Sequence, residues 1–350
     1  MDFADISPKL TMLVYGLVAF AVVVGGLLLL LDVVPSYFAR RRERQLIAVA
    51  AGEAPALPPG RMHKPREFGY AIFFLLPVVV LLLIGLVVPV VRTLVLSLKN
   101  GDGSEWVGLD NYGWMFSNGD ILSVLWNSLL WVVLVPLVAT SVGLIYAVLV
   151  DRARLEAVAK SLVFLPMAIS FVGASIIWRF VYAYRGEEQD QIGLLNQIVV
   201  WLGGTPKQWL LDSPLNTLLL IVVMVWIQAG FAMVILSAAI KAVPGDIIEA
   251  ARLDGVSAWQ MFWRITLPSI RPALIVVIVA ITVATMKIFD IVRTMTNGNY
   301  DTNVIALEMY NQAFRYQETG QGSALAVFLF ILVIPIVIFQ IRNLRRQREG

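Results

Sequence analysis

The chain has 350 residues, of which 59% are hydrophobic and only 15% are charged, and its mean hydropathy is +0.80. A soluble globular protein has about 45–50% apolar and about 25% charged residues, so this composition excludes an ordinary soluble domain. The sequence has no cysteine and a single histidine, His63, which excludes a disulfide framework and a metal site with the usual number of zinc ligands.

The apolar residues are gathered in long runs. Seven stretches each contain about 20 mainly apolar residues, which is the length that crosses a bilayer as a helix. They lie near residues 11–34, 70–92, 122–150, 161–183, 214–240, 272–296 and 322–341. We therefore expect an all-α, polytopic helical membrane protein with seven spans.

The basic residues are distributed unevenly between the loops that connect these runs. If the N-terminus lies outside, the inner connections carry 18 Lys and Arg residues and the outer connections carry five. The inner connections are then 35–69, 151–160, 241–271 and 342–350. By the positive-inside rule the sequence predicts an N-outside, C-inside topology. The net charge of +3 follows from this orientation and does not indicate nucleic-acid binding.

The first run stands apart from the other six. The basic cluster Arg40–Arg44 follows this run and no positive region precedes it, so we expect a retained helix rather than a signal peptide. A Pro-rich linker then leads to the second run. We predict two parts: residues 1–69, an extra transmembrane helix with its cytoplasmic linker, and residues 70–345, a transmembrane domain of six spans with an inner loop at 241–271.

That inner loop carries an ordered pattern of polar residues. Asp246 and Glu249 have the spacing of a helix N-cap residue and its N3 acid, which predicts that a short helix begins at Asp246. Gly255 would end this helix in the left-handed conformation. The first half of the loop is therefore predicted to be a helix followed by a glycine elbow.

The second half of the loop repeats the capping pattern. Ser257 and Gln260 predict the start of a second short helix, which Pro268 is expected to stop. This half exposes more apolar surface than a solvated loop requires, through Trp259, Met261, Phe262, Trp263 and Ile265. They either lie in the lipid headgroup region or dock into a groove of a cytoplasmic protein.

The same loop resembles a known family. Glu249-Ala250-Ala251, Gly255 and Ile265–Pro268 match the E-A-A-(x3)-G-(x9)-I-x-L-P signature of permease subunits of bacterial ATP-binding-cassette importers. The resemblance implies that Glu249, Ala250, Ala251 and Gly255 couple the permease to an ATPase. Trp259 and Phe262, as exposed apolar residues of the same loop, are expected to join them at the docking surface. It also implies a type I importer fold.

The resemblance covers about residues 70 to 341 and points to the maltose-type, carbohydrate-importing branch. It is carried by the stretches 107–116, 164–178, 193–203 and 287–298. Thr296–Tyr300 departs from the T-x-G-G-P of that branch, whereas TNVIALEMYNQAF at 302–314 is similar to α-glucoside permeases. Because Thr296–Tyr300 departs from the branch pattern, the α-glucoside subclass is indicated by this one loop alone.

The sixth predicted core span contains three charged residues. Lys287, Asp290 and Arg293 follow one another at i, i+3 spacing, which would place them in one sector of a helix. Ionisable groups inside a membrane are costly unless they are paired or hydrated. They therefore either form a structural salt bridge or border a polar, water-accessible cavity.

A sugar site needs flat apolar faces and a few polar groups that bind hydroxyls. The candidates are Trp226, Gln228, Phe231, Thr282, Thr285 and Phe289. The resemblance places Trp226, Phe231 and Thr285 at substrate-lining positions, with Gln228 between the first two. Each of these side chains is also consistent with ordinary helix packing, in which a threonine can bond to its own helix.

The resemblance as a whole implies a permease subunit of an importer in the bacterial inner membrane that moves a sugar or oligosaccharide, such as the α-glucosides maltose or trehalose, inward. Its partners would be a second permease subunit in a heterodimer, two cytoplasmic ATP-binding subunits and an extracytoplasmic solute-binding protein. The chain has no Walker A, H-E-x-x-H or G-x-S-x-G motif, so a partner must carry out any phosphate chemistry. The resemblance implies that the partner ATPase binds ATP and Mg²⁺ and that this chain holds no cofactor or metal and catalyses no reaction.

Two other classes of protein fit the sequence less well. A self-sufficient secondary transporter or channel would need repeat-related broken helices within the chain, and we find no such repeat in the sequence. An integral-membrane enzyme would need a convergent catalytic cluster, and the acidic group Glu187, Glu188 and Asp190 fits a solvated outer loop better.

The predicted topology can be tested with a reporter fusion. Alkaline phosphatase, which is active only outside, should be active when fused after Asn299 and inactive when fused after Pro268 or Arg346, because the basic residues assign these positions to opposite sides. The reverse pattern of activity would overturn the orientation.

Overall fold

The computed structural model describes residue 26, residues 75–150 and residues 155–349, with side chains as far as Asn343. The chain divides into two compact units, residues 1–89 and 90–350. The predicted first span and the predicted domain boundary at residue 70 fall outside the described residues, apart from residue 26, and both stay predictions.

The described part of the chain is helical, as predicted, and its one β contact is a bridge between Lys99 and Trp106. The helix that follows the linker runs from Leu75 to Leu96 and contains a π turn, η3 (Leu83–Val87), before α4 (Val88–Leu96). This helix corresponds to the predicted span 70–92.

Unit 90–350 contains the remaining elements. In chain order they are α5 (Asp110–Ser117), α6 (Gly119–Val150), α7 (Glu156–Phe164), the 3₁₀ helix η4 (Leu165–Ala168), α8 (Phe171–Val181), α9 (Leu194–Trp201), α10 (Leu215–Lys241), α11 (Gly245–Leu253), α12 (Ala258–Met261), the π turn η5 (Phe262–Thr266), α13 (Leu267–Ser269), α14 (Arg271–Met286), α15 (Asp290–Met295), α16 (Ile305–Tyr310), the π turn η6 (Asn311–Arg315) and α17 (Thr319–Glu349).

Four helices in the described part of the chain are long and apolar enough to cross a membrane. They are Leu75–Leu96, Gly119–Val150, Leu215–Lys241 and Thr319–Asn343. Two bent pairs, Glu156–Ala168 with Phe171–Val181 and Ala258–Ser269 with Arg271–Met286, bring the total to six if each pair is one span. This range includes the six spans predicted from residue 70 onward.

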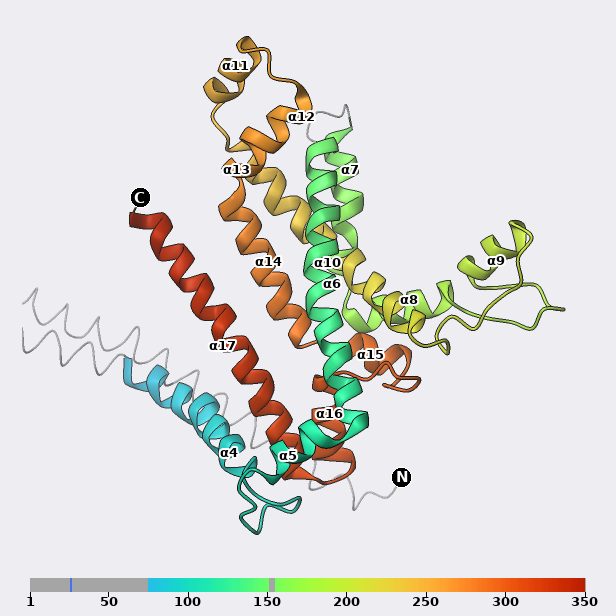
Figure 1. Ribbon diagram of the computed structural model, residues 1–350, viewed down its shortest axis with the longest axis vertical. Helices are drawn as coiled ribbons and strands as arrows, with labels where there is room; N and C mark the ends of the chain where they lie inside the picture. Colours follow the sequence, from blue (N-terminus) through green and yellow to red (C-terminus); the bar gives the residue numbers. More distant parts are fainter. Residues whose placement is uncertain (1–25, 27–74, 151–154, 350) are drawn as a thin grey trace, which may run out of the picture. The chain divides into compact units, whose positions relative to one another are not determined.

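The central pair of helices in this unit is α6 and α10, which are nearly apolar all round and lie side by side (Figure 1). Trp131, Val135 and Ala139 on α6 are fully buried. Gly143 marks the closest approach, because a Cβ added there would lie 2.5 Å from the Cβ of Ala232. Small residues let two membrane helices approach in this way, since dispersion contacts replace the hydrophobic effect between helices in lipid.

The predicted continuous helix over 161–183 is wrong, because the chain bends by 105° between η4 and α8. Pro166 lies in η4, and Ile169 is extended. Ser170 then caps α8 by accepting a hydrogen bond from the amide of Gly173 at 3.1 Å. The proline and the capping serine together end one helix and begin another in a new direction.

The predicted continuous helix over 272–296 is also wrong. Helix α14 ends at Met286, Lys287 is its C-cap residue, and α15 begins only at Asp290. Phe289, which precedes α15, has φ −133° and ψ −54°, outside the helical region. The three charged residues of this segment therefore do not share one helix, and the expected common sector is not formed.

The loop that follows α15 is tied to both central helices. The side-chain amide of Asn127 on α6 donates to the carbonyls of Asp301 and Asn303, and that of Asn216 on α10 donates to the carbonyl of Tyr300. Asp301 and Tyr300 both have positive φ, near 60°. These side-chain bonds from two helices hold the strained loop in one conformation.

Helices α11 and α12 lie at one end of unit 90–350, and α5 and α16 lie at the opposite end (Figure 1). The loop 241–271 and the loop after α15 are thus separated by the length of α14. This separation agrees with their assignment to opposite sides of a membrane.

Replacing Gly143 with Ala should lower the stability of the protein. The new methyl group would meet Ala232 at 2.5 Å and the backbone nitrogen of Met233 at 2.7 Å, so the two central helices must move apart. Overpacking of this kind costs about 1–3 kcal/mol. Thermal unfolding in detergent measures the loss, with Gly113→Ala as the control because nothing lies within 4 Å of a Cβ there. An equal melting temperature for Gly143→Ala and the control would contradict the close packing.

Candidate coupling loop and substrate cavity

The first half of the loop 241–271 forms helix α11, but it does not begin as predicted. The N-cap residue is Pro244 and no side chain caps the helix, so the predicted cap at Asp246 is wrong. Asp246 instead lies in the first turn, where its charge favours the positive end of the helix dipole. Because Pro244 is extended and has no amide hydrogen, it begins the helix two residues earlier than the capping pattern indicates.

The predicted glycine elbow at Gly255 is present. Gly255 has φ +74°, and its amide donates to the carbonyl of Arg252 at 3.1 Å. The amide of Val256 donates to the carbonyl of Ala251 at 3.1 Å. These two bonds form a Schellman motif, which satisfies the last carbonyls of α11 and reverses the chain.

The predicted capping box of the second short helix is also present. The Ser257 hydroxyl accepts from the amide of Gln260 at 3.3 Å, and the Gln260 side chain accepts from the amide of Ser257 at 3.0 Å. The predicted stop at Pro268 is wrong, because the helix continues to Ser269. The π turn η5 changes the bonding register ahead of the proline, so Pro268 falls in the first turn of a new segment, where its missing amide hydrogen is tolerated.

The predicted coupling residues divide into exposed and buried groups. Glu249, Ala250, Gly255 and Trp259 are exposed, Phe262 is half-buried and Ala251 is buried. Phe262 packs edge to face against Trp263, which in turn packs against Trp259. The sequence reasoning missed Leu253, which is 89% exposed. The sequence signal that could have indicated an exposed Leu253 was its position two residues before the glycine elbow.

A cavity of about 470 Å³ lies where the bend before α8 meets α10 and α15. It brings together Gln228 and Phe231 from α10 and Asp290 from the start of α15. The other lining residues are Met167, Ile169, Ser170, Phe171 and Ile227. Among the described residues, the side chains of Gln228 and Asp290 form no hydrogen bond with each other or with a neighbour, and Asp290 forms no ion pair. Their polar groups are therefore available to a ligand.

The bend residues Met167 to Phe171 were not among the predicted site residues. The signal for them was the combination of Pro166 and a serine placed three residues before Gly173, which together predict a helix break. A break inside an apolar run lets the chain line a cavity.

The other predicted substrate residues lie elsewhere. Trp226 packs against Trp178 of α8 with ring centroids 5.7 Å apart, and Phe289 packs against Tyr310 at 5.4 Å. The hydroxyl of Thr282 donates to the carbonyl of Ile278 in its own helix. The structure therefore gathers two of the six predicted contacts, Gln228 and Phe231, around one cavity.

Thr285 lines a second cavity, of about 340 Å³, between α6, α14, α16 and α17. Thr285 is 1% exposed, and its hydroxyl donates to the carbonyl of Ile281 at 2.8 Å. The lining of this cavity is otherwise almost entirely apolar. A threonine whose hydroxyl is bound to its own helix offers little to a polar ligand.

The three charged residues that follow α14 lie in different environments. Arg293 donates to the side-chain oxygen of Asn297 at 2.5 Å and stacks on the ring of Tyr310. Lys287 is exposed, and Asp290 lines the 470 Å³ cavity. No salt bridge joins the three among the residues that the structure describes. The structural salt bridge that was one of the two alternatives is thus not formed. The helix break separates Lys287 from Asp290, and Arg293, which shares α15 with Asp290, bonds to Asn297 instead.

A comparison with protein-family models identifies residues 139–349 as a binding-protein-dependent transport system inner membrane component. The chain belongs to this family. Members are multi-pass transport subunits, so the predicted resemblance is confirmed and the self-sufficient transporter is not favoured. An enzyme of the membrane is not favoured either, because the relatives are transport permeases.

Two relatives of this permease match most of its length. An osmoprotective compounds uptake permease protein of Synechocystis is 49% identical over 276 residues, which cover 79% of this chain and 99% of that protein. An alpha-glucoside transport system permease protein of Rhizobium meliloti is 47% identical over 278 residues, which cover 79% of this chain and 83% of that protein.

A solved structure shares the fold of this permease. A subunit of a bacterial ABC transporter involved in the import of the acidic polysaccharide alginate superposes with a TM-score of 0.70 and 23% identity. The match covers 82% of this chain and 99% of that subunit. The type I importer permease fold that the sequence implied is therefore confirmed.

Substitutions at Gly255 test whether the elbow matters for transport. Val at φ +74° is strained by roughly 1–2 kcal/mol, whereas Asn tolerates this conformation. We expect Gly255→Val to impair transport and Gly255→Asn to retain most of it, while both variants insert normally. Uptake and co-purification of the ATPase subunit are the measurements. Normal transport by Gly255→Val with unaltered ATPase binding would mean that the elbow has no coupling role.

Proposed function

We propose that this permease imports a sugar or small oligosaccharide, with α-glucosides such as maltose and trehalose as the leading candidates. The observation that carries the proposal is the cavity at which Gln228, Phe231 and Asp290 meet. Two relatives support the substrate class: the alpha-glucoside permease described above, and a trehalose/maltose transport system permease protein of Thermococcus litoralis, which is 30% identical over 298 residues.

The chemistry of the cavity suits a sugar. The ring of Phe231 offers a flat apolar face for the C–H surface of a pyranose. The Asp290 carboxylate accepts hydrogen bonds from hydroxyl groups, and the Gln228 amide both donates and accepts. The volume of about 470 Å³ is within the range of about 300–1,000 Å³ that is typical of small-molecule sites.

The remaining parts of the transporter come from partners. A second permease subunit would form a heterodimer with this chain, and a solute-binding protein would deliver the substrate from outside. Two ATP-binding subunits would bind the loop 241–271 from the cytoplasm and supply ATP and Mg²⁺. Glu249, Ala250, Ala251, Gly255, Trp259 and Phe262 would transmit ATPase closure to the spans, and the exposed Leu253 extends this docking surface.

In this mechanism the chain catalyses no bond chemistry. ATP-driven closure of the ATPase dimer displaces the docked loop, and the rigid spans carry the displacement to the cavity. The two conformations expose the cavity in turn to the outside and the inside. The substrate then moves inward because it is delivered outside and released inside. The membrane orientation in this scheme is N-outside and C-inside, with seven spans.

Substitutions in and near the cavity test the substrate site. Gln228→Ala and Asp290→Asn should lower uptake of radiolabelled trehalose and maltose without changing the yield of the assembled complex, because both side chains face the cavity. Trp226→Ala removes the contact with Trp178 and should lower the yield itself, since loss of a packed Trp costs about 3–5 kcal/mol.

Three results would count against this assignment. Full uptake by both cavity variants would remove the cavity from the path. A normal yield together with lost uptake in Trp226→Ala would return Trp226 to the substrate site. Uptake of neither sugar by the wild-type complex would exclude them as substrates.

A further inference from the structure

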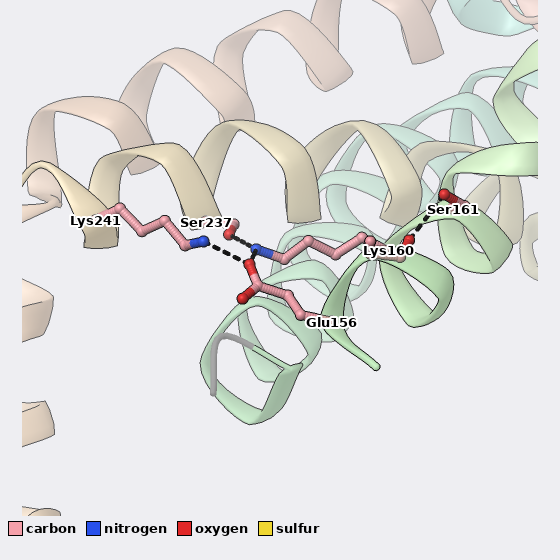
Figure 2. A network of polar contacts seen from close by, with 6 residues as sticks. Glu156, Lys160, Ser161, Ser237 and Lys241 are labelled. Atoms are coloured by element: carbon pink, nitrogen blue, oxygen red, sulfur yellow. Dashed lines mark hydrogen bonds and ion pairs between the residues drawn. The ribbon is translucent and has the colours of Figure 1, made fainter. Parts of the chain in front are cut away.

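A polar cluster joins the first turn of α7 to the last turns of α10 (Figure 2). One carboxylate oxygen of Glu156, Oε1, accepts from Nζ of Lys160 at 2.6 Å and from Nζ of Lys241 at 2.5 Å. Nζ of Lys160 also donates to the hydroxyl of Ser237 on α10. The two helices are thus linked by two bonds, at residues that are far apart in the sequence.

The links in this cluster are charge-assisted, and such hydrogen bonds are shorter and stronger than neutral ones. Ser237 is 4% exposed, and the side chains of Lys160 and Glu156 are 20% and 27% exposed, whereas that of Lys241 is 51% exposed. The Glu156 to Lys160 pair is an i, i+4 contact within one helix. The bond from Lys241 is therefore an ion pair that crosses from α10 to α7.

A second contact holds the same two helices together further along. At Gly230 of α10, an added Cβ would lie 2.5 Å from the carbonyl oxygen of Val163 in α7, so the backbones touch there. Gly230 lies between the cavity residues Gln228 and Phe231. Helix α10 consequently contacts α7 at two positions: the backbones meet at Gly230, beside the cavity, and the ion pair forms at Lys241.

These two contacts between α7 and α10 lie on the stretch of α10 that joins the cavity to the loop 241–271. Lys241 is the last residue of α10, and α11 begins at Gly245. Residues of α10 line one part of the cavity, and the bend from Met167 in η4 to Phe171, which follows α7 in the chain, lines another part. These two walls are therefore extensions of the helices that the cluster holds together.

We propose that Glu156 and Lys241 are positioning residues that clamp α7 to α10, so that a displacement of the loop 241–271 moves both walls of the cavity as one body. The proposal rests on the proposed function, because it assumes that an ATPase acts on this loop. Without the clamp the loop still moves, but α10 bends away from α7 and less of the motion reaches the cavity. ATP is then hydrolysed with less transport.

The first test compares transport with ATP hydrolysis in the full complex, reconstituted in liposomes. Glu156→Gln and Lys241→Met should each lower the amount of trehalose imported per ATP hydrolysed by about twofold to thirtyfold, with an unchanged yield of complex. The double variant should be no worse than the poorer single variant, because both changes remove the same bond. Lys241→Arg keeps the bond and should keep the wild-type ratio, as should the control Glu187→Gln, an exposed acid in another loop.

A merely structural ion pair would change the yield and leave the ratio unaltered, and that result overturns the clamp. A double variant whose losses multiply would overturn it as well, since independent losses show that the two residues do not act through one bond. If Glu156→Gln fails to assemble, Lys241→Met and Lys241→Arg decide the question, because the Lys241 side chain is half exposed and tolerates substitution.

The second test does not depend on the substrate. The chain has no cysteine, so spin labels can be attached at Val158→Cys on α7 and Ala242→Cys at the end of α10, both of which are exposed. The distance between the labels should stay single and unchanged between the ATP-free and vanadate-trapped complex, and should broaden when Glu156→Gln is added. A distance that changes in the otherwise wild-type protein would overturn the clamp, even if neither sugar is transported and the proposed function fails.

Discussion

The close packing of α10 against two neighbours is the constraint on which the rest of this unit depends. On one side, Gly143 of α6 allows close contact with Ala232 and Met233 of α10. On another side, Gly230 of α10 allows close contact with the backbone of Val163 in α7. A bilayer supplies no hydrophobic effect between helices, so such contacts, made by small residues, decide which helices pair. Because α10 is fixed in this way, the side chains at its cavity face and the loop at its end have defined positions.

The cavity exists because two apolar runs are not continuous helices. The first break, at η4 and Ser170, turns the chain by 105° and supplies one wall. The second break, between Met286 and Asp290, brings a carboxylate to the cavity at the start of a new helix. Irregular backbone at membrane depth is tolerated where it is buried in protein or lines a water-filled space. The two breaks and the polar lining are therefore parts of one arrangement.

The loop 241–271 and the cavity are stabilised by different kinds of interaction. The loop is held by short-range bonds, such as the Schellman motif at Gly255 and the capping box of Ser257 and Gln260. It therefore keeps its shape while Leu253 and Trp259 stay exposed. The cavity is held by long-range contacts between helices. An importer needs both, because a preformed docking element must pass its motion to a site that can open and close.

The sequence by itself determined the features that depend on composition and on neighbouring residues. The apolar runs predicted a helical membrane fold with six spans from residue 70 onward, and the structure has four single helices and two bent pairs of this kind among the described residues. Glycine and serine in the loop 241–271 predicted the elbow and the capping box. Each of these follows from residues within a few positions of one another. The family signature in the loop was also readable, since it is contiguous in the chain.

Only the tertiary structure decided the features that depend on residues far apart. The break at Lys287 could not be read from an apolar run, because the side-chain pattern is the same for a straight and a broken helix. The same limit explains why Gln228 and Phe231 share a cavity with Asp290 while Trp226 packs against Trp178. Glu156 and Lys241 carry no local signal of their bond, since their meeting depends on how α7 and α10 pack. Packing between helices selects these partners, and that selection lies beyond the reach of local sequence pattern.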